Sequence, residues 1–214
     1  WIATANGLNR FDGINFKIYK PSVFNKNYLS NGFVTAVKQD AEGNIWAATQ
    51  KGLNRIDALT DTTEVLTAVN EQYKINLSKE SVWDVLPDGD AVWIVIDTKP
   101  LIYYNTKTKQ SRHYDFKKFL ADNHIEFTAI YHSVFKIVPD GKNGLWLATT
   151  DGIIHFDKLT GTFELTAGMA LDEITFFEYE AAVGKLYCAD ERNIIYTYDV
   201  ANKKLNSIAT DAAK

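Results

Sequence analysis

Residues able to carry out chemistry are few and scattered in this sequence. The chain has 214 residues, with four histidines and a single cysteine, Cys188. No two histidines stand at a metal-ligand spacing on one strand or helix, and Cys188 has no second thiol to pair with. We therefore predict no metal site, no cofactor and an inert, buried thiol at Cys188. The histidines are His113, His124, His132 and His155.

Carboxylates are the other chemical resource, and there are 27 of them. Four Asp-Gly pairs resemble fragments of a calcium loop, but no stretch supplies alternating oxygen ligands and a terminal Glu, so turn geometry explains them. No two carboxylates stand out as a glycosidase pair, and nucleophile-elbow, P-loop and dinucleotide motifs are absent. We expect a non-catalytic segment. The pairs are Asp12-Gly13, Asp88-Gly89, Asp140-Gly141 and Asp151-Gly152.

Composition narrows the classes of partner. The net charge is −4, and no Lys/Arg cluster is longer than a pair, which argues against nucleic-acid binding. No apolar run is long enough to span a bilayer, so we expect no direct membrane insertion by this segment. The chain opens on Trp1 in the middle of a motif, which suggests a piece of a larger protein.

One pattern recurs five times along the chain. An aromatic residue returns at intervals of 45, 47, 53 and 41 residues, and a turn residue such as Gly follows about six positions later. Next come a short apolar strand that ends in Asp or Asn, a hairpin and a further strand. Another strand precedes the aromatic one, beginning near Val34, Val82, Val134 and Phe176. The aromatic residues are Trp1, Trp46, Trp93, Trp146 and Tyr187.

Four short antiparallel strands in 40 to 50 residues are typical of a β-propeller blade. Strands such as Ile45-Trp46-Ala47-Ala48 are apolar on both faces, as expected for a sheet between two others. We predict an all-β propeller of about five four-stranded blades, with the first incomplete, cut from a larger propeller. A five-bladed ring lacking one inner strand is the alternative, and a β-sandwich is the second choice of fold. The predicted blades cover residues 1–20, 33–67, 81–115, 133–166 and 175–209.

Two sets of residues are candidates for a site. In our alignment the third position of the inner strand carries Asp84, Lys136 and Glu178, which would either form salt bridges between blades or ring a central channel. The simpler interpretation is the salt bridges. Loop aromatics that can stack on sugar rings are the second set, and such loops often carry function. They are Tyr28, Tyr73, Tyr131 and His132, with Phe116 as a further member that also fits a helical turn over 116–123.

His155 holds a position that the alignment gives to Arg10, Arg55, Tyr103 and Tyr196 in the other repeats. Because the position varies so widely in chemistry, we interpret His155 as structural.

The repeats resemble those of the two-component regulator propeller family. Its consensus is a strand, Asp-x-x-Gly-x-Ile-Trp, a small-residue stretch and Gly-Leu-x-Arg, and the stretch from Asp40 through Trp46 to Arg55 fits it closely. The segment that begins at Trp1 fits equally well. The third and fifth repeats have drifted, with Pro100 and Asn193 in place of the Gly.

This resemblance implies a function. Family members resemble the extracytoplasmic sensor halves of hybrid two-component regulators, some of which detect oligosaccharides. It implies a periplasmic location in an inner-membrane protein, an oligosaccharide ligand, and contact with further blades or a second propeller of the parent chain, which would be a homodimer. A plain interaction scaffold and a propeller lyase or hydrolase are the alternatives.

Overall fold

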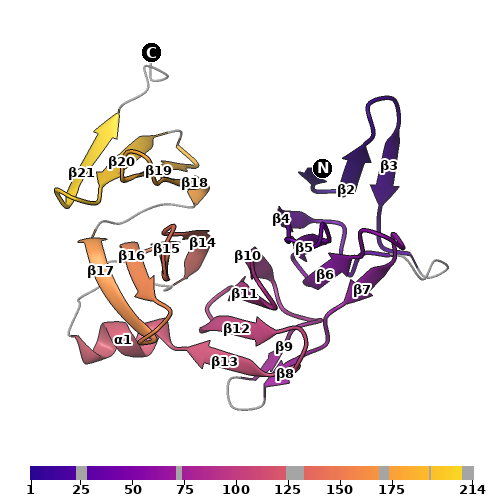
Figure 1. Cartoon of the computed structure of the whole chain (residues 1–214), viewed down its shortest axis with the longest axis horizontal. Helices are drawn as coiled ribbons and strands as arrows, with labels where there is room; N and C mark the ends of the chain where they lie inside the picture. Colours follow the sequence, from indigo (N-terminus) through magenta and orange to yellow (C-terminus); the bar gives the residue numbers. More distant parts are fainter. Residues whose placement is uncertain (23–27, 71–73, 124–132, 169–173, 193, 209–214) are drawn as a thin grey trace. The chain divides into compact units, whose positions relative to one another are not determined.

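The computed structural model describes residues 1–22, 28–70, 74–123, 133–168, 174–192 and 194–208. Apart from one short helix, the regular secondary structure of this part consists of strands, which form five antiparallel sheets of three or four strands and one small two-stranded sheet (Figure 1). In each of the five sheets the strands lie side by side in chain order. The predicted all-β propeller fold with five blades, the first with three strands, is confirmed.

Residues 1–113 form one compact unit. The first sheet contains β1 (Ile2–Thr4), β2 (Gly7–Phe11) and β3 (Phe16–Tyr19). The second contains β4 (Val34–Gln39), β5 (Ile45–Thr49), β6 (Gly52–Ile56) and β7 (Thr63–Val65). The third contains β10 (Val82–Asp88), β11 (Ala91–Ile96), β12 (Leu101–Asn105) and β13 (Ser111–Tyr114). Between the second and third sheets, β8 (Val69–Asn70) pairs with β9 (Ile75–Asn76).

Residues 114–214 form the second compact unit. It begins with α1 (Phe116–Asp122). The fourth sheet contains β14 (Val134–Pro139), β15 (Gly144–Thr149), β16 (Gly152–Asp157) and β17 (Thr162–Gly168). The fifth contains β18 (Ile174–Glu180), β19 (Lys185–Asp190), β20 (Ile195–Asp199) and β21 (Lys204–Ile208).

The predicted helical turn is present as α1. The Asp115 side chain caps its first turn by accepting a hydrogen bond from the Lys118 amide at 3.0 Å. Phe116 is buried, and its ring packs edge-on against Phe163 of β17 with 6.0 Å between centroids. Phe116 therefore belongs to the core and is not a surface aromatic available to a sugar.

The second strands of the second, third and fourth sheets are buried on both faces, as their sequences predict. All five residues of β5 and all six of β11 and β15 are buried. In the first unit the second sheet is covered on one side by Leu8 and Tyr19 of the first sheet, and on the other Trp46 and Ala48 pack with Val85 of β10. Burial of both faces accounts for the missing polar alternation in these strands.

A threonine closes one hairpin in each of three blades: β1–β2 in the first, β5–β6 in the second and β15–β16 in the fourth. Its hydroxyl donates to the carbonyl of a glycine three residues later, and that glycine has a φ above 100° that favours Gly. The Thr-x-x-Gly spacing is therefore a sequence signal for this hairpin, in addition to the glycine alone. The pairs are Thr4–Gly7, Thr49–Gly52 and Thr149–Gly152.

The fifth blade lacks this threonine and uses a carboxylate instead. Asp190 at the end of β19 accepts hydrogen bonds from the amides of Arg192 (3.1 Å) and Ile194 (3.0 Å), and its side chain pairs with the Arg192 guanidinium at 2.6 Å. Burial alone would raise the pKa of Asp190, but these hydrogen bonds outweigh it and lower the pKa. The drifted repeat thus keeps the turn by different chemistry.

The strand register corrects two columns of the sequence alignment. Each inner strand has a bulge after its first residue, and the fifth one begins at Ile174, two residues before the predicted Phe176. Phe176, not Glu178, is therefore equivalent to Asp84 and Lys136. Likewise Trp146 lies opposite His155 and Tyr187 lies opposite Thr197, so Thr197 replaces Tyr196 in the arginine column.

Candidate functional site

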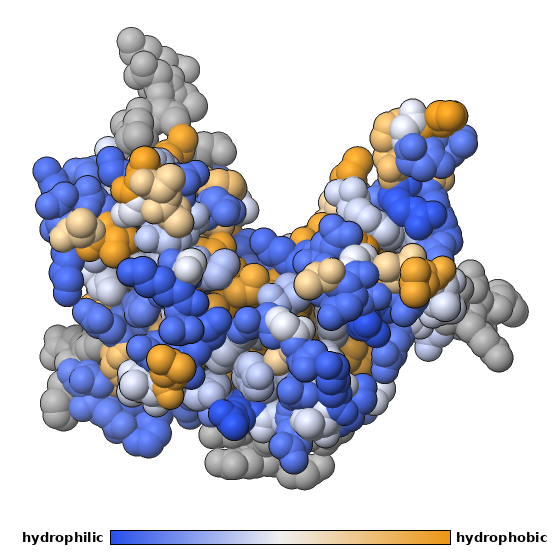
Figure 2. Space-filling view, viewed as in Figure 1, coloured by the Kyte–Doolittle hydropathy of each residue, from blue (hydrophilic) through white to orange (hydrophobic). Residues whose placement is uncertain are grey.

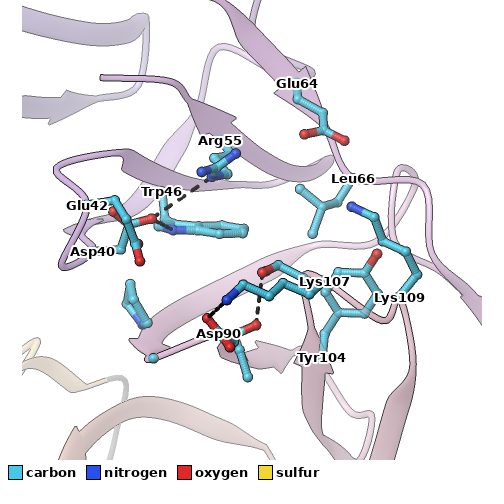
Figure 3. A pocket seen from close by; sticks show the side chains of 14 residues that line it. Asp40, Glu42, Trp46, Arg55, Glu64, Leu66, Asp90, Tyr104, Lys107 and Lys109 are labelled. Carbon is cyan, nitrogen blue, oxygen red and sulfur yellow. Dashed lines mark hydrogen bonds and ion pairs between the residues drawn. The ribbon is translucent and has the colours of Figure 1, made fainter. Parts of the chain in front are cut away.

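A cavity of about 320 Å³ lies between the second and third sheets of the first unit (Figure 3). We name it the Trp46 cavity. The second sheet contributes an aromatic floor and the ends of β6 and β7, and the third contributes Tyr104 and the hairpin after β12. The residues lining it are Asp40, Glu42, Trp46, Arg55, Glu64, Leu66, Pro87, Gly89, Asp90, Ala91, Tyr104, Thr106, Lys107 and Lys109.

Trp46 is held by two neighbours whose positions follow from the repeat. Its indole Nε1 donates to Asp40 Oδ2 at 2.9 Å. Across the β5–β6 pair Arg55 lies directly opposite Trp46, and its guanidinium carbon is 5.9 Å from the ring centroid. In Figure 3 the Trp46 ring lies between Arg55 on one side and the Asp90–Lys107 pair on the other.

Asp40 satisfies several donors at once. Besides the indole, it accepts hydrogen bonds from the backbone amide of Asn44 (2.8 Å) and from the Asn44 side chain (3.0 and 3.1 Å). The Asn44 carbonyl oxygen in turn accepts from the amide of Ala58 at 3.0 Å. The motif Asp-x-x-Gly-Asn-Ile-Trp is therefore a hydrogen-bonded unit that fixes the Trp46 ring.

The rim of the Trp46 cavity carries paired charges. Lys107 Nζ lies 2.7 Å from Asp90 Oδ1, and this hydrogen bond raises the pKa of Lys107. On the opposite rim Glu64 projects from β7. Burial, with the charge of Glu64, raises the pKa of Tyr104. Aromatic surfaces beside both donors and acceptors can bind a polyhydroxylated ligand.

The second unit contains an equivalent cavity of about 260 Å³ between the fourth and fifth sheets. We name it the Trp146 cavity. Asp140, Trp146 and Glu164 repeat Asp40, Trp46 and Glu64, and Tyr198 and Lys203 repeat Tyr104 and Lys109. Lys203 Nζ lies 3.3 Å from Glu164 Oε1. The remaining lining residues are Lys142, His155, Thr166, Tyr179 and Val200.

The polar centres of the two cavities differ. In the second unit His155 replaces the arginine, and its Nε2 lies 3.0 Å from Asp140 Oδ2. Burial alone would raise the pKa of Asp140, but hydrogen bonds from His155 and from the amides of Gly144 and Lys142 outweigh it and lower the pKa. Trp146 Nε1 is buried and has no hydrogen-bond partner among the residues that the structure describes.

The first two sheets meet through an ion cluster with reversed charges. At the equivalent place Lys17 of β3 pairs with Asp61, which follows β6, and Tyr19 also donates a hydrogen bond to Asp61. Burial raises the pKa of Tyr19, and Asp61 adds to the rise. The last strand of the first sheet thus places a basic residue, Lys17, at its junction with the second sheet. The last strand of the fourth sheet places an acidic residue, Glu164, at its junction with the fifth sheet.

Of the four loop residues predicted to bind sugar, only Tyr28 lies in the described part of the chain. Tyr28 has an exposed fraction of 40% and lines neither of these cavities. Tyr73, Tyr131 and His132 lie outside the described residues. Those four residues therefore stay predictions.

The charged inner-strand residues have dissimilar surroundings. Asp84 is buried, and its Oδ1 accepts a hydrogen bond from the Val85 amide at 2.9 Å. Lys136 is half-buried and Glu178 is exposed. Both are described residues, and no ion pair joins them, so that part of the predicted salt-bridge series is wrong.

The cysteine at position 188 is buried and unpaired by any disulfide. Burial raises the pKa of the Cys188 thiol to about 12, as the prediction of an inert thiol requires. Among residues with described positions, no group of three or more His, Cys, Asp or Glu side chains is placed to hold a metal ion. In the same part of the chain, no helix is long and apolar enough to cross a membrane.

The motif around Trp46 is similar to that of a known family of repeats. Residues 28–51 match the family model of the two component regulator propeller. This segment is similar to a two component regulator propeller repeat. It contains Asp40, Asn44 and Trp46, the hydrogen-bonded unit at the floor of the Trp46 cavity. No curated protein matches the chain.

Solved structures with the same fold come from B. thetaiotaomicron. The extracellular domain described as that of the hybrid two component system BT3049 is 19% identical, with a TM-score of 0.74 over 98% of this chain and 26% of that one. For BT4673, also described as a hybrid two component system, the values are 16%, 0.75, 100% and 30%. This chain therefore spans under a third of the length of the domains that it matches.

Proposed function

We propose that this chain is part of the extracytoplasmic sensor region of a hybrid two-component signalling protein. There it would detect or relay an oligosaccharide signal toward a histidine kinase located elsewhere in the same polypeptide. The carrying observation is that a two component regulator propeller repeat sits within a chain whose whole fold matches the extracellular domains of such systems. The proposed location is the periplasm, as the extracytoplasmic part of an inner-membrane protein.

In this proposal the segment makes and breaks no covalent bonds. Ligand contacts would shift the relative stability of two arrangements of a homodimeric parent, and the kinase would respond to that shift. The two cavities support an oligosaccharide as the ligand, since both combine a buried Trp and a Tyr with paired acidic and basic side chains. Further blades or a second propeller of the parent are the proposed structural partners.

Binding and signalling are best tested together on the parent protein. We would titrate its complete extracytoplasmic region with defined oligosaccharides by calorimetry, and measure phosphorylation of the full-length protein in nanodiscs with the same compounds. We expect saturable binding of one glycan class and a change in phosphorylation at the same concentrations. Binding of no glycan by folded protein would contradict the ligand class, and binding without altered phosphorylation would contradict the relay.

A second candidate function is a non-catalytic interaction scaffold. It is favoured by the outer face of the first sheet, where apolar side chains are solvent-exposed and are visible over the β2–β3 hairpin (Figure 2). Under this alternative the segment would hold another propeller or a partner protein and contact no small ligand. Lysine substitutions at Phe16 and Ile18 would then abolish signalling, while variants in the two cavities would leave it intact.

A further inference from the structure

One buried indole differs from its counterparts elsewhere in the chain. Trp46 and Trp93 each donate their Nε1 hydrogen to an aspartate, Asp40 or Asp88, at 2.9 Å. Trp146 occupies the same repeat position as Trp46 and is 5% exposed, yet its Nε1 has no partner. Buried donors are nearly always hydrogen-bonded, so an unpaired one at the floor of a cavity calls for an explanation.

The acceptor is present but is engaged by another side chain. Asp140 Oδ2, the counterpart of the oxygen that Trp46 uses, receives His155 Nε2 at 3.0 Å. Two residues permit this arrangement. His155 stands in place of Arg55, and Gly144 stands in place of Asn44. A Cβ at position 144 would collide with both Asp140 Oδ2 and the His155 ring.

The Asp140 carboxylate therefore bonds to the imidazole and not to the indole, and among the described residues the Trp146 N–H is left unpaired. In the Trp46 cavity the corresponding aspartate oxygen accepts from the indole and also from the Asn44 side chain. In the alternative arrangement at Trp146, the indole bonds to Asp140 as Trp46 does to Asp40, and the imidazole is released. The alternative becomes favourable when something else receives the imidazole, because every donor is then satisfied.

We infer that the Trp146 cavity binds a single hydroxylated sugar ring, and that His155 turns from Asp140 to a ligand hydroxyl while the Trp146 indole takes over Asp140. This inference rests on the proposed function, because it takes the ligand class from there. It adds a particular site and a residue that senses occupation of that site.

The walls of the Trp146 cavity suit such a ligand. Trp146 has Tyr179 and Tyr198 as aromatic neighbours, with ring centroids 5.9 and 6.3 Å away. On the rim the Glu164–Lys203 pair offers an acceptor and a donor to hydroxyl groups. A volume of about 260 Å³ lies just below the usual range of ligand sites, about 300 to 1,000 Å³, and so fits one ring better than a chain.

The indole N–H itself provides the readout. We would label the tryptophan side chains of the protein with ¹⁵N, assign the Trp146 signal with Trp146→Phe, and titrate with the methyl glycosides of glucose, galactose and mannose. We expect one of them to move the Trp146 N–H signal downfield saturably, as a new hydrogen bond requires. Absence of any such shift up to about 50 mM, where a millimolar site is filled, overturns the inference.

A pair of double variants tests the exchange of donors. Gly144→Asn with His155→Arg installs the Trp46 arrangement, so the Trp146 signal should already be downfield without ligand and glycoside affinity should fall at least tenfold. The matched control, Asn44→Gly with Arg55→His, alters the other cavity and should leave that affinity unchanged. Wild-type affinity in the first variant overturns the inference. Tyr179→Ala, at a half-buried rim position, is the second test should the double variant fail to fold.

Failure here is distinguishable from failure of the proposed function. Oligosaccharide binding to the parent that leaves the Trp146 signal unmoved would overturn this site and keep the sensor role. A Trp146 shift with a monosaccharide glycoside, but no oligosaccharide binding and no phosphorylation response, would support the site and contradict the sensor role.

Discussion

At the scale of single residues, one carboxylate organises each Trp-centred turn. Asp40→Ala would leave the indole of Trp46 and the amide of Asn44 without their acceptor in a site where the Asp40 side chain is 7% exposed. Unsatisfied buried donors cost about 1–3 kcal/mol each, so we expect the free energy of unfolding to fall by about 3 kcal/mol. Urea denaturation followed by tryptophan fluorescence measures this change.

The control is a carboxylate with similar bonds in an exposed turn. Asp57 accepts hydrogen bonds from the amides of Leu59 (3.0 Å) and Thr60 (2.8 Å), and these amides can bond to water when it is removed. Asp57→Ala should lower the free energy of unfolding far less than Asp40→Ala does. Equal losses for the two variants would show that the Asp40–Trp46 bond has no special weight.

At the residue scale, the sequence predicts the repeat motif but not the hydrogen bonds that its residues form. The spacing from Asp40 to Trp46 marked a repeat, but which donor uses the carboxylate depends on residue 44 and on the residue opposite the Trp across a hairpin. His155 was interpreted as structural from its variable column. Its effect on Trp146 appears only when Gly144 and Asp140 are seen beside it.

At the scale of elements, the glycine in the hairpin after β5 carries a steric requirement. Gly52 has φ 109°, and a Cβ there would lie 2.9 Å from Ser30 Oγ and 3.2 Å from Ser30 Cβ. Gly52→Ala should therefore destabilise the fold by about 2–3 kcal/mol through strained backbone and crowding. Thermal denaturation of the purified variant measures the loss.

Gly89→Ala is the matched control for this substitution. Gly89 has φ 57°, in the left-handed region that other residues enter at a modest cost, and a Cβ there meets nothing within 4 Å. About 1 kcal/mol is expected. If Gly89→Ala proved as harmful as Gly52→Ala, crowding against Ser30 could not be the cause.

The junction between the first and second sheets should be sensitive to acid. Burial alone would raise the pKa of Asp61, but hydrogen bonds from Lys17 and Tyr19 outweigh it, so its folded-state pKa lies below the unfolded value of about 3.9. Stability from this group is fully present above that value and is lost as pH falls through the folded pKa. Asp61→Asn should flatten the decline in unfolding free energy measured between about pH 5 and 2. An unchanged decline would assign the acid sensitivity to other carboxylates.

Elements were predicted well where the motif is strong and less well where it has drifted. The helical spacing of Phe116 and Leu120 correctly indicated α1. The inner strand of the fifth blade was placed two residues late, because Tyr187 had replaced Trp and the bulge after Ile174 leaves no mark in the residue pattern. The small β8–β9 pair was missed, since two-residue strands are too short to show a period.

At the scale of the whole molecule, the repeats make the fold predictable from sequence, but they do not reveal the cavities between neighbouring sheets. The blades are predictable because all five copies of the pattern indicate the same strands. The cavities lie between neighbouring sheets, and their lining combines residues some 60 positions apart, such as Trp46 and Lys107. No pattern within one repeat brings such residues together. The sequence therefore indicates loop aromatics as candidate ligand contacts and gives no sign of the cavities.

One face of the first sheet is exposed, whereas the corresponding face of the second sheet is covered. On that face Ile2, Phe11, Phe16 and Ile18 have exposed fractions of 50, 49, 57 and 52%. In the second sheet the same positions include Ala47 and Ile56, at 0 and 2%, which pack under Leu8 and Tyr19 of the first sheet.

We therefore expect the 214-residue chain to self-associate through this face, since burying apolar area from water is favourable. Sedimentation velocity should show a molar mass that rises with concentration for the native sequence, and a monomer for Phe16→Lys with Ile18→Lys. Leu59→Lys with Leu159→Lys is the control, because these side chains are 96 and 78% exposed but stand singly at hairpin tips. That control should associate like the native chain. A native chain that stays monomeric at high concentration would mean that the apolar face of β1–β3 is too small to bind a second copy.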